Sequence, residues 1–289
     1  MAEPVVAPVC VPQQSRIPKI IHLTFKEKTG LPEAIAANLR DIAALNPDFA
    51  LRLYDDAAVR EFIRSAYGAA ILAIFDRLSP KYGAARADLF RYLCIYKLGG
   101  VYLDIKAGVT RPLSSVIHAS DQYLLAQWDP VIEDGRFSKW GRYPEISHVA
   151  GGEFQQWHVI AAPGHPFLQA VIEEVLRRIQ KYAPFRDGAG RLGVLRTTGP
   201  IVYTQAIFPL RDQHPHRMVR AEADLGLHYS VYDHRQAQSH LQHFSQHYST
   251  QIEPLVWRGG LIDRSFVLSQ RALRMARAIW QWRRRWRTD

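Results

Sequence analysis

The sequence has little cysteine and no long apolar run, and each scarcity excludes a class of protein. Its 289 residues include two cysteines, Cys10 and Cys94, which excludes a disulfide framework and favours a reducing compartment. No apolar run approaches the roughly 20 residues that a membrane-spanning helix needs. The segment 1–15 lacks a basic stretch and is interrupted by prolines, so we interpret it as a mobile tail and not as a signal peptide. A cytoplasmic location is therefore expected.

Positive charge is in excess, but it is concentrated at one end of the chain. The formal net charge is +10, and 271–289 hold seven arginines and one aspartate, a net of +6. Subtracting that segment leaves only +4 for the rest of the chain. The excess predicts an anionic partner. Nucleic acid is not expected, because the body carries little excess charge and contains no recognisable nucleic-acid module.

The C-terminal segment 261–289 is expected to stand apart as a basic helix, formed by Ser269 to Arg287. Leu273, Ile279 and Trp280 fall on one side of this helix, among arginines. Arginine mixed with tryptophan is typical of a helix that lies on a membrane surface. The alternative is a solvated helix that packs its tryptophans on the domain. We expect the first, which would make the protein peripheral at an anionic membrane.

The centre of the chain, Ser79 to Gly108, is predicted to form a helix, a tight turn and a buried strand. Gly83 to Lys97 contains no proline and has apolar residues at helical spacing. Gly99 and Gly100 are expected to stop the helix, because glycine accepts the left-handed conformation found at helix ends. Val101 to Ile105 is apolar and β-rich, which is typical of a buried strand.

Charged side chains follow this helix and this strand. Strand alternation predicts that Tyr102, Asp104 and Lys106 share one face. A carboxylate at the carboxyl end of a buried strand lies where open α/β sheets bind ligands. On the helix, Asp88 and Arg91 are three residues apart and share a face. The alternative for this pair is an exposed salt bridge with no function.

Strands and helices alternate before and after this stretch, which predicts an α/β sheet in one domain spanning 16–260. Asp55 and Asp56 are interpreted as a helix N-cap. The irregular stretch from Asp129 to Gly152, rich in Gly, Pro, Trp and Tyr, is assigned to acceptor binding. The predicted strands are Arg16–Phe25, Leu51–Tyr54, Gln122–Trp128 and Trp157–Ala162, and the predicted helices are Pro32–Ala44, Ala57–Tyr67, Ala69–Arg77 and Phe167–Tyr182.

The pattern A-x-x-A-D-x-x-R-Y around Asp88, followed by GG-V-Y-L-D-I, resembles the DXD-motif sugar transferases of glycosyltransferase family 32. The resemblance covers most of 16–260. It implies a GT-A fold, a Rossmann-like mixed sheet flanked by helices. It also implies a nucleotide-sugar donor (a UDP- or GDP-hexose), Mn²⁺ or Mg²⁺, and transfer with retention to a hydroxyl of a glycan or lipid-linked saccharide.

The same resemblance implies roles for donor-side residues. It makes Asp88 and Arg91 contacts of the donor sugar, with Tyr102 beside them, and Asp104 the ligand of the metal and diphosphate. Phe25 occupies the position of an aromatic residue that stacks on the nucleotide base in relatives. The alternative for Phe25 is that it fills core.

Three further residues are implied on the acceptor or metal side. Gln156 matches a polar amide before an apolar strand, His165 belongs to a similar G-H-P-F turn, and Thr198 to a similar T-G-P at a helix start. His165 is alternatively a residue that only stabilises its turn, and Thr198 a helix cap. His247 is the nearest match to a last metal or phosphate ligand. It lies in a histidine-rich segment that is alternatively a solvent-exposed loop.

One position departs from the family pattern. The second aspartate of D-x-D is replaced, since the chain has Asp104-Ile105-Lys106. A metal can still bind through Asp104, the diphosphate and a C-terminal ligand, or Lys106 can itself neutralise the diphosphate, or activity is lost. We therefore expect a hexosyltransferase whose catalytic residues are Asp104 and Lys106. The alternative is a non-catalytic relative that binds sugar nucleotides or glycans through a degenerate motif.

Overall fold

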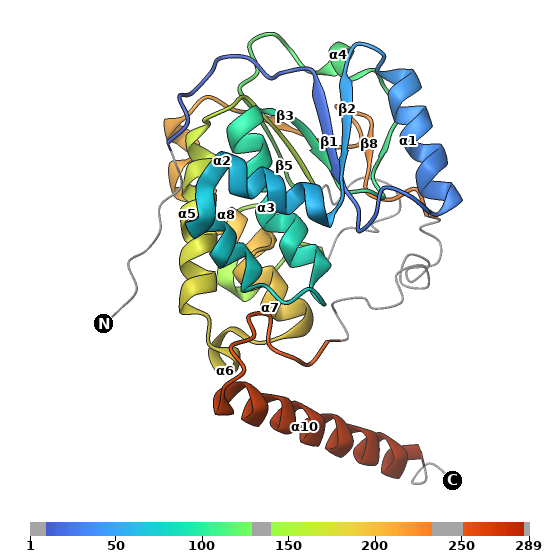
Figure 1. Ribbon diagram of the computed structural model, residues 1–289. Helices are drawn as coiled ribbons and strands as arrows, with labels where there is room; N and C mark the ends of the chain where they lie inside the picture. Colours follow the sequence, from blue (N-terminus) through green and yellow to red (C-terminus); the bar gives the residue numbers. More distant parts are fainter. Residues whose placement is uncertain (1–9, 129–139, 233–250, 286–289) are drawn as a thin grey trace.

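The computed structural model describes residues 10–128, 140–232 and 251–285 (Figure 1). In these residues one mixed sheet of six strands has the order β2-β1-β3-β6-β5-β7. β1 is parallel to β2 and β3, β6 is antiparallel to β3 and β5, and β7 is parallel to β5. A separate pair joins β4 to β8. The strands are β1 (Ile20–Thr24), β2 (Ala50–Tyr54), β3 (Gly100–Leu103), β4 (Gly108–Val109), β5 (Tyr123–Ala126), β6 (His158–Ala161), β7 (Arg217–Val219) and β8 (Leu227–His228).

Helices cover both faces of the sheet, so the predicted mixed sheet flanked by helices is confirmed. In Figure 1, α2, α3, α5 and α8 lie on one side of the strands and α1 on the other. Each face has its own apolar core, one around Phe90 and Leu93 of α3 and one around Ile42 of α1. The helices are α1 (Glu33–Leu45), α2 (Asp56–Asp76), α3 (Gly83–Leu98), α4 (Leu113–Val116), α5 (Pro166–Lys181), α6 (Pro184–Asp187), α7 (Gly190–Thr197), α8 (Pro200–Ile207) and α10 (Leu261–Arg285), with short 3₁₀ segments at Pro144–Ile146 and Phe208–Gln213.

The turn between α3 and β3 is formed, as predicted, by two glycines with positive φ angles. Gly99 and Gly100 have φ angles of 65° and 101°, where side-chain-bearing residues are strained. A Cβ atom on Gly100 would lie 2.5 Å from the backbone oxygen of Ile20. The two glycines therefore let the chain leave a largely buried helix and enter the sheet directly beside β1.

Most other predicted elements have the expected type, with ends shifted by a few residues. Asp55 caps α2 as expected, since its Oδ1 accepts from the backbone N–H of Ala58 at 2.8 Å. The two helices predicted on either side of Gly68 form one element with a break at that residue, where φ is 82°. α10 begins at Leu261, eight residues earlier than Ser269. Cys94 is fully buried in α3, as predicted.

One prediction about the central strand is wrong. β3 ends at Leu103, so Ile105 and Lys106 do not continue it. Instead the chain turns at Asp104, whose backbone oxygen accepts from the N–H of Ala107 at 2.8 Å. The alternation that would place Lys106 on the same face as Asp104 therefore does not apply.

The C-terminal helix α10 extends away from the rest of the molecule (Figure 1). It contacts α6 through Phe266, whose ring lies edge-on to Phe185 with 5.2 Å between centroids. Asp263, in the first turn of α10, accepts from the backbone N–H groups of Arg258 and Gly259 at 2.7 and 2.9 Å and so fixes the segment before the helix. None of the helices in the described ranges combines the length and apolar character that a membrane-spanning segment requires.

Candidate active site

A buried arginine joins the two carboxylates that the sequence singles out. Arg91 lies on α3, and its guanidinium forms ion pairs with Oδ1 of Asp104 at 2.9 Å and Oδ1 of Asp88 at 3.1 Å. It also donates to the backbone and side-chain oxygens of Gln156, and lies 4.8 Å from the ring centroid of Tyr102. The exposed salt bridge considered for Asp88 and Arg91 is excluded, because both side chains are almost completely buried.

Asp88 is held by neutral donors as well as by Arg91. Thr198 Oγ1 donates to its Oδ2 at 2.9 Å, and Gln156 Nε2 donates to its Oδ1 at 3.2 Å. Burial raises the pKa of Asp88 to about 6, although Arg91 and Thr198 act in the opposite direction. Burial lowers the pKa of Arg91, but Asp104, Tyr102 and Asp88 raise it by more, so that its net shift is upward. Arg91 therefore stays charged, and Asp88 gains less than a full counter-charge because Arg91 is shared with Asp104.

Asp104 is the member of this group that reaches the surface. Its side chain is one-quarter exposed, whereas those of Asp88 and Arg91 are buried. Its backbone N–H donates to the oxygen of Trp157 at 2.8 Å, which fixes the end of β3 against the segment before β6. In this group the carboxylate of Asp104 is therefore accessible from the surface, and the buried guanidinium of Arg91 holds it in place.

The described residues do not form a site that fits a divalent metal. Within the described ranges, no group of three His, Cys, Asp or Glu side chains lies close enough to hold one. Oδ1 of Asp104 is already paired with Arg91. The next polar residue, Lys106, is a cation whose Nζ lies 3.9 Å from the centroid of the Tyr229 ring. His247, the expected C-terminal ligand, lies outside the described residues.

The remaining predicted residues fall into two groups. Gln156 and Thr198 lie with Asp88 and Arg91, and Thr198 bonds Asp88 and does not cap α8, whose N-cap is Gly199. Phe25 follows β1 and Asp104 follows β3, and because these strands are parallel both residues lie at the carboxyl end of the strands. Phe25 is partly buried. His165 is not brought to this group. It is fully buried at the start of α5, where its ring nitrogens bond the backbone N–H of Phe167 and the oxygen of Pro215.

Sequence reasoning missed an aromatic cluster, formed by Trp128, Trp140, Trp157 and Tyr229. The ring of Tyr229 lies 5.4, 5.6 and 5.7 Å from those of Trp128, Trp140 and Trp157, centroid to centroid. Trp140 is 42% exposed, while Trp128 and Trp157 are buried. The density of tryptophan around the irregular stretch is the one signal in the sequence that pointed here.

A buried carboxyl group lies against this cluster. Glu153 accepts from the indole N–H of Trp128 through Oε1 at 2.5 Å. Its Oε2 has no hydrogen-bond partner among the described residues. Burial raises the pKa of Glu153 to about 7, and the Trp128 hydrogen bond lowers it less. Gly141 permits this packing, since a Cβ there would lie 2.6 Å from Cγ of Glu153.

Comparison with known proteins places the charged group inside a recognised region. Residues 32–124 match the family model described as "Glycosyltransferase sugar-binding region containing DXD motif". "Inositol phosphoceramide mannosyltransferase 3" of Schizosaccharomyces pombe is 31% identical over 65% of this chain and 44% of its own length. "Initiation-specific alpha-1,6-mannosyltransferase" of the same organism is 25% identical over 68% of this chain and 49% of its own.

These curated relatives are longer proteins, and the chain spans less than half of the length of each. A solved structure titled "PaToxG Glycosyltransferase" is similar with 16% identity and a TM-score of 0.45, covering 69% of this chain and 73% of that one. The residues matched by the family model include Asp88, Arg91, Asp104 and Lys106.

Proposed function

The chain carries a glycosyltransferase region of the DXD-motif, family 32 type, and from this premise we propose that it transfers a hexose from a nucleoside-diphosphate sugar to a hydroxyl of a glycan or glycolipid, with retention. Mannose is the first sugar to test, because both relatives described above are named mannosyltransferases. The single observation that carries the proposal is the partly exposed Asp104 held at the end of β3 by the buried Arg91.

The buried residues orient the group that meets the donor. Arg91 cannot itself reach a ligand, because it is 2% exposed and its guanidinium is occupied by two carboxylates and Gln156. Its role is to fix Asp104, whose second oxygen can accept from a sugar hydroxyl. Electrostatic groups held in place before the reaction need no reorganisation when charge develops.

The departing diphosphate needs a cation beside it. Family enzymes of the DXD type generally use a divalent metal, but the described residues do not fit one, so we derive no step through it. We propose that Lys106 supplies this charge. Lys106 is partly exposed, lies two residues from Asp104, and has its Nζ over the Tyr229 ring. A lysine side chain is flexible and binds phosphate as a point charge.

The test is donor hydrolysis over a panel of UDP- and GDP-hexoses, with Mn²⁺, with Mg²⁺ and with EDTA. Asp104→Asn should abolish hydrolysis of the preferred donor, while Asp48→Asn, which changes an exposed carboxylate paired with Lys19, should not. Hydrolysis that survives EDTA supports the role of Lys106. Hydrolysis that requires Mn²⁺ or Mg²⁺ would instead assign the diphosphate to a metal, and an unaffected Asp104→Asn variant would overturn the site.

A second candidate function is binding without turnover. The observation that favours it is the replacement of the second aspartate by Lys106. A non-catalytic relative would bind a nucleotide sugar through the same residues and release neither sugar nor nucleotide. Isothermal titration against the same donor panel distinguishes the two, because saturable binding with no hydrolysis and no transfer supports this candidate.

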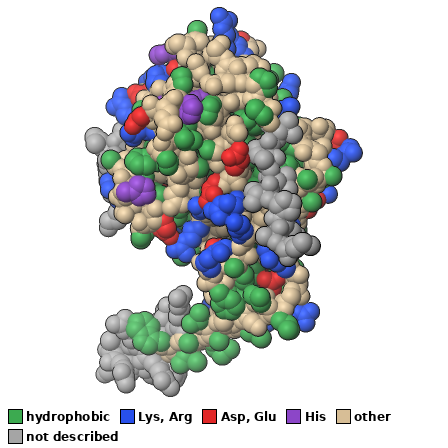
Figure 2. Space-filling view, turned by 90° about the vertical axis from the view of Figure 1, so that its left-hand side faces the viewer, with side chains coloured by type: hydrophobic (Ala, Val, Ile, Leu, Met, Phe, Trp, Pro, Cys, Tyr) green, Lys and Arg blue, Asp and Glu red, His purple; other side chains and the backbone are tan. Residues whose placement is uncertain are grey.

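We propose that α10 holds the protein peripherally at an anionic membrane. Apolar side chains are exposed along it, and several are visible in Figure 2. Arginines are interspersed with them, which combines apolar burial with attraction to anionic lipid. The exposed apolar residues are Leu261, Ile262, Leu268, Leu273, Met275, Ile279 and Trp280.

Sedimentation with vesicles tests this location. Wild type should bind vesicles of phosphatidylglycerol and not of phosphatidylcholine, and the double variant Leu268→Glu, Met275→Glu should lose binding. Leu192→Glu is the control, because Leu192 is an exposed leucine outside α10. Equal binding to both vesicles would remove the electrostatic part of the proposal, and no binding would remove it entirely. The cytoplasmic location stays a prediction that cell fractionation tests.

A further inference from the structure

Three buried polar atoms without partners lie within six residues of each other. Among the described residues, Oε2 of Glu153, Nε1 of Trp157 and Nδ1 of His158 form no hydrogen bond. Buried polar side chains are nearly always satisfied in folded proteins, because the lost hydration is not otherwise recovered. Such a concentration in one segment makes it a candidate for binding a ligand that carries hydroxyl groups.

The surroundings of these atoms match the chemistry of a sugar ring. The rings of Trp128, Trp140 and Trp157 each lie edge-to-face with the ring of Tyr229, with centroids less than 6 Å apart. Glu153 lies against Trp128. A hexose has apolar C–H faces and a rim of hydroxyl groups. Aromatic rings cover the former, while a carboxylate and an indole N–H accept from and donate to the latter. Binding sites for small polar molecules combine these same two elements.

The cluster adjoins the group around Asp104. The oxygen of Trp157 accepts from the N–H of Asp104 at 2.8 Å, and Lys106 Nζ lies over the Tyr229 ring. Gln156, next to Trp157, contacts Asp88 and Arg91. Gln156 therefore belongs to the charged group around Asp104, and its neighbour Trp157 belongs to the aromatic cluster, so the two groups lie side by side.

We propose that the aromatic cluster and Glu153 form the acceptor subsite, and that the acceptor presents a hexose ring there. This inference rests on the proposed glycosyl transfer and names its acceptor class. Glu153 receives a hydrogen bond from a ring hydroxyl, Trp157 donates one, and Trp140 covers an apolar face of the ring. A bare lipid hydroxyl or a protein side chain would leave the aromatic faces uncovered.

The test compares Trp140→Ala and Glu153→Gln with wild type and with Trp257→Ala. Trp257 is a matched control, because it is 44% exposed and Trp140 is 42% exposed. Two rates are measured, hydrolysis of the donor in water and transfer to methyl α-D-mannopyranoside, methyl α-D-glucopyranoside and methyl α-D-galactopyranoside. The two subsite variants should raise the KM for the best hexoside about tenfold, the loss of one aromatic or charged contact. They should leave donor hydrolysis within about twofold, and Trp257→Ala should change neither.

A direct binding measurement keeps the inference separable from the proposed function. Saturation-transfer NMR with each hexoside, in the presence of the nucleoside diphosphate, should show binding to wild type that Trp140→Ala weakens. If wild type binds a hexoside through Trp140 but hydrolyses no donor, the transferase proposal fails and the subsite stands. If wild type hydrolyses a donor but binds no hexoside at millimolar concentration, or the variants bind as wild type does, the subsite is overturned.

Discussion

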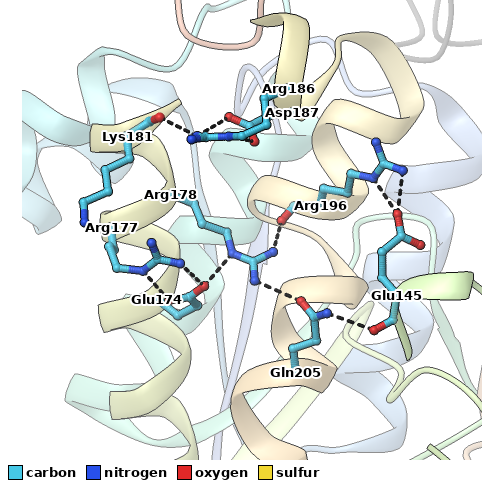
Figure 3. Close-up of polar contacts among 9 residues, drawn as sticks. All are labelled: Glu145, Glu174, Arg177, Arg178, Lys181, Arg186, Asp187, Arg196 and Gln205. Atoms are coloured by element: carbon cyan, nitrogen blue, oxygen red, sulfur yellow. Dashed lines mark hydrogen bonds and ion pairs between the residues drawn. The ribbon is translucent and has the colours of Figure 1, made fainter. Parts of the chain in front are cut away.

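Two charged networks in this molecule use the same residue types under opposite conditions. The surface network joins α5, α7 and α8 to the turn at Glu145 (Figure 3). There Arg178 pairs with Glu174 at 2.7 Å and donates to Gln205 at 2.9 Å, and Arg196 pairs with Glu145 at 2.6 Å. The buried cluster, formed by Asp88, Arg91 and Asp104, sets one guanidinium between two carboxylates.

The two networks differ in their exposure to solvent, and their roles differ accordingly. Arginines and lysines gather on the outside of the molecule beside carboxylates, as Figure 2 shows. A depression of about 560 Å³ in the surface network is lined by Glu173, Glu174, Arg177, Arg178 and Gln205. Its arginines are paired with Glu174 on the same helix, α5. Arg178 also donates to the backbone oxygen of Arg196 on α7 and to Gln205 on α8, and these contacts link the three helices. The buried cluster contains two carboxylates and one guanidinium. The carboxylate that reaches the surface is that of Asp104.

The largest expected effect that sharpens this comparison comes from Arg91→Ala. Removing the guanidinium leaves Asp88 buried with no cation, which should lower the free energy of unfolding by about 3–5 kcal/mol. Urea denaturation measures it, with Arg178→Ala as the matched arginine of the surface network. A cost for Arg91→Ala no greater than that for Arg178→Ala would show that burial does not separate the two networks.

The next effect is a dependence on pH with opposite signs at two glutamates. Burial raises the pKa of Glu153 from 4.5 to about 7, so between these values the folded state keeps a proton that the unfolded state has released. The unfolding free energy of wild type relative to Glu153→Gln should therefore be highest below pH 4.5 and fall by about 2–3 kcal/mol as the pH rises to 7. At Glu145 its own backbone N–H, and then Arg196, lower the pKa, so that its contribution is present at neutral pH and lost on acidification.

Chemical denaturation of Glu153→Gln and Glu145→Gln across pH 3 to 8 measures both slopes. Differences from wild type are required, because burial also lowers the pKa of His22, His158 and His165 to about 4, 3 and 4, and these neutral histidines add an opposing slope. Their contribution cancels in the difference between wild type and variant. Parallel profiles for Glu153→Gln and wild type would contradict the prediction.

A smaller effect is expected at Lys106. Its substitution tests whether the lysine or a metal ion neutralises the charge of the diphosphate. Lys106→Ala should lower the rate of donor hydrolysis about tenfold, the effect of one charge-assisted contact. Lys106→Asp restores the second carboxylate of the motif, so its hydrolysis should respond to Mn²⁺. Rates with and without EDTA measure both. An unchanged rate in Lys106→Ala would exclude this residue from the site.

The parts of the site that could be predicted are those set by local sequence. Asp88 and Arg91 share a helix face because of their spacing, and two glycines end α3 and start β3. Gln156 and Thr198 came from resemblance alone, since they reach Asp88 from positions 68 and 110 residues further along the chain. No local pattern contains such a contact.

The prediction failed where a turn or a tertiary contact decided the outcome. Extending the apolar run through Ile105 predicts that Lys106 shares a strand face with Asp104, whereas the chain turns at Asp104. The aromatic cluster assembles rings from four separate segments of the chain. Its unpartnered atoms are visible only once the burial of each side chain is known.

The smallest expected effect belongs to the surface network. Arg196→Ala removes a pair with Glu145 in which both side chains are partly exposed, so the loss should stay below about 1 kcal/mol. Urea denaturation at low and at 1 M NaCl measures it, and salt should reduce the difference from wild type because it screens exposed charges. Donor hydrolysis should be unchanged, since among the described residues neither Arg196 nor Glu145 contacts the buried cluster. A salt-insensitive loss comparable to that of Arg91→Ala would mean that the surface network is as desolvated as the buried cluster, and pairing alone would then no longer tell structural charges from functional ones.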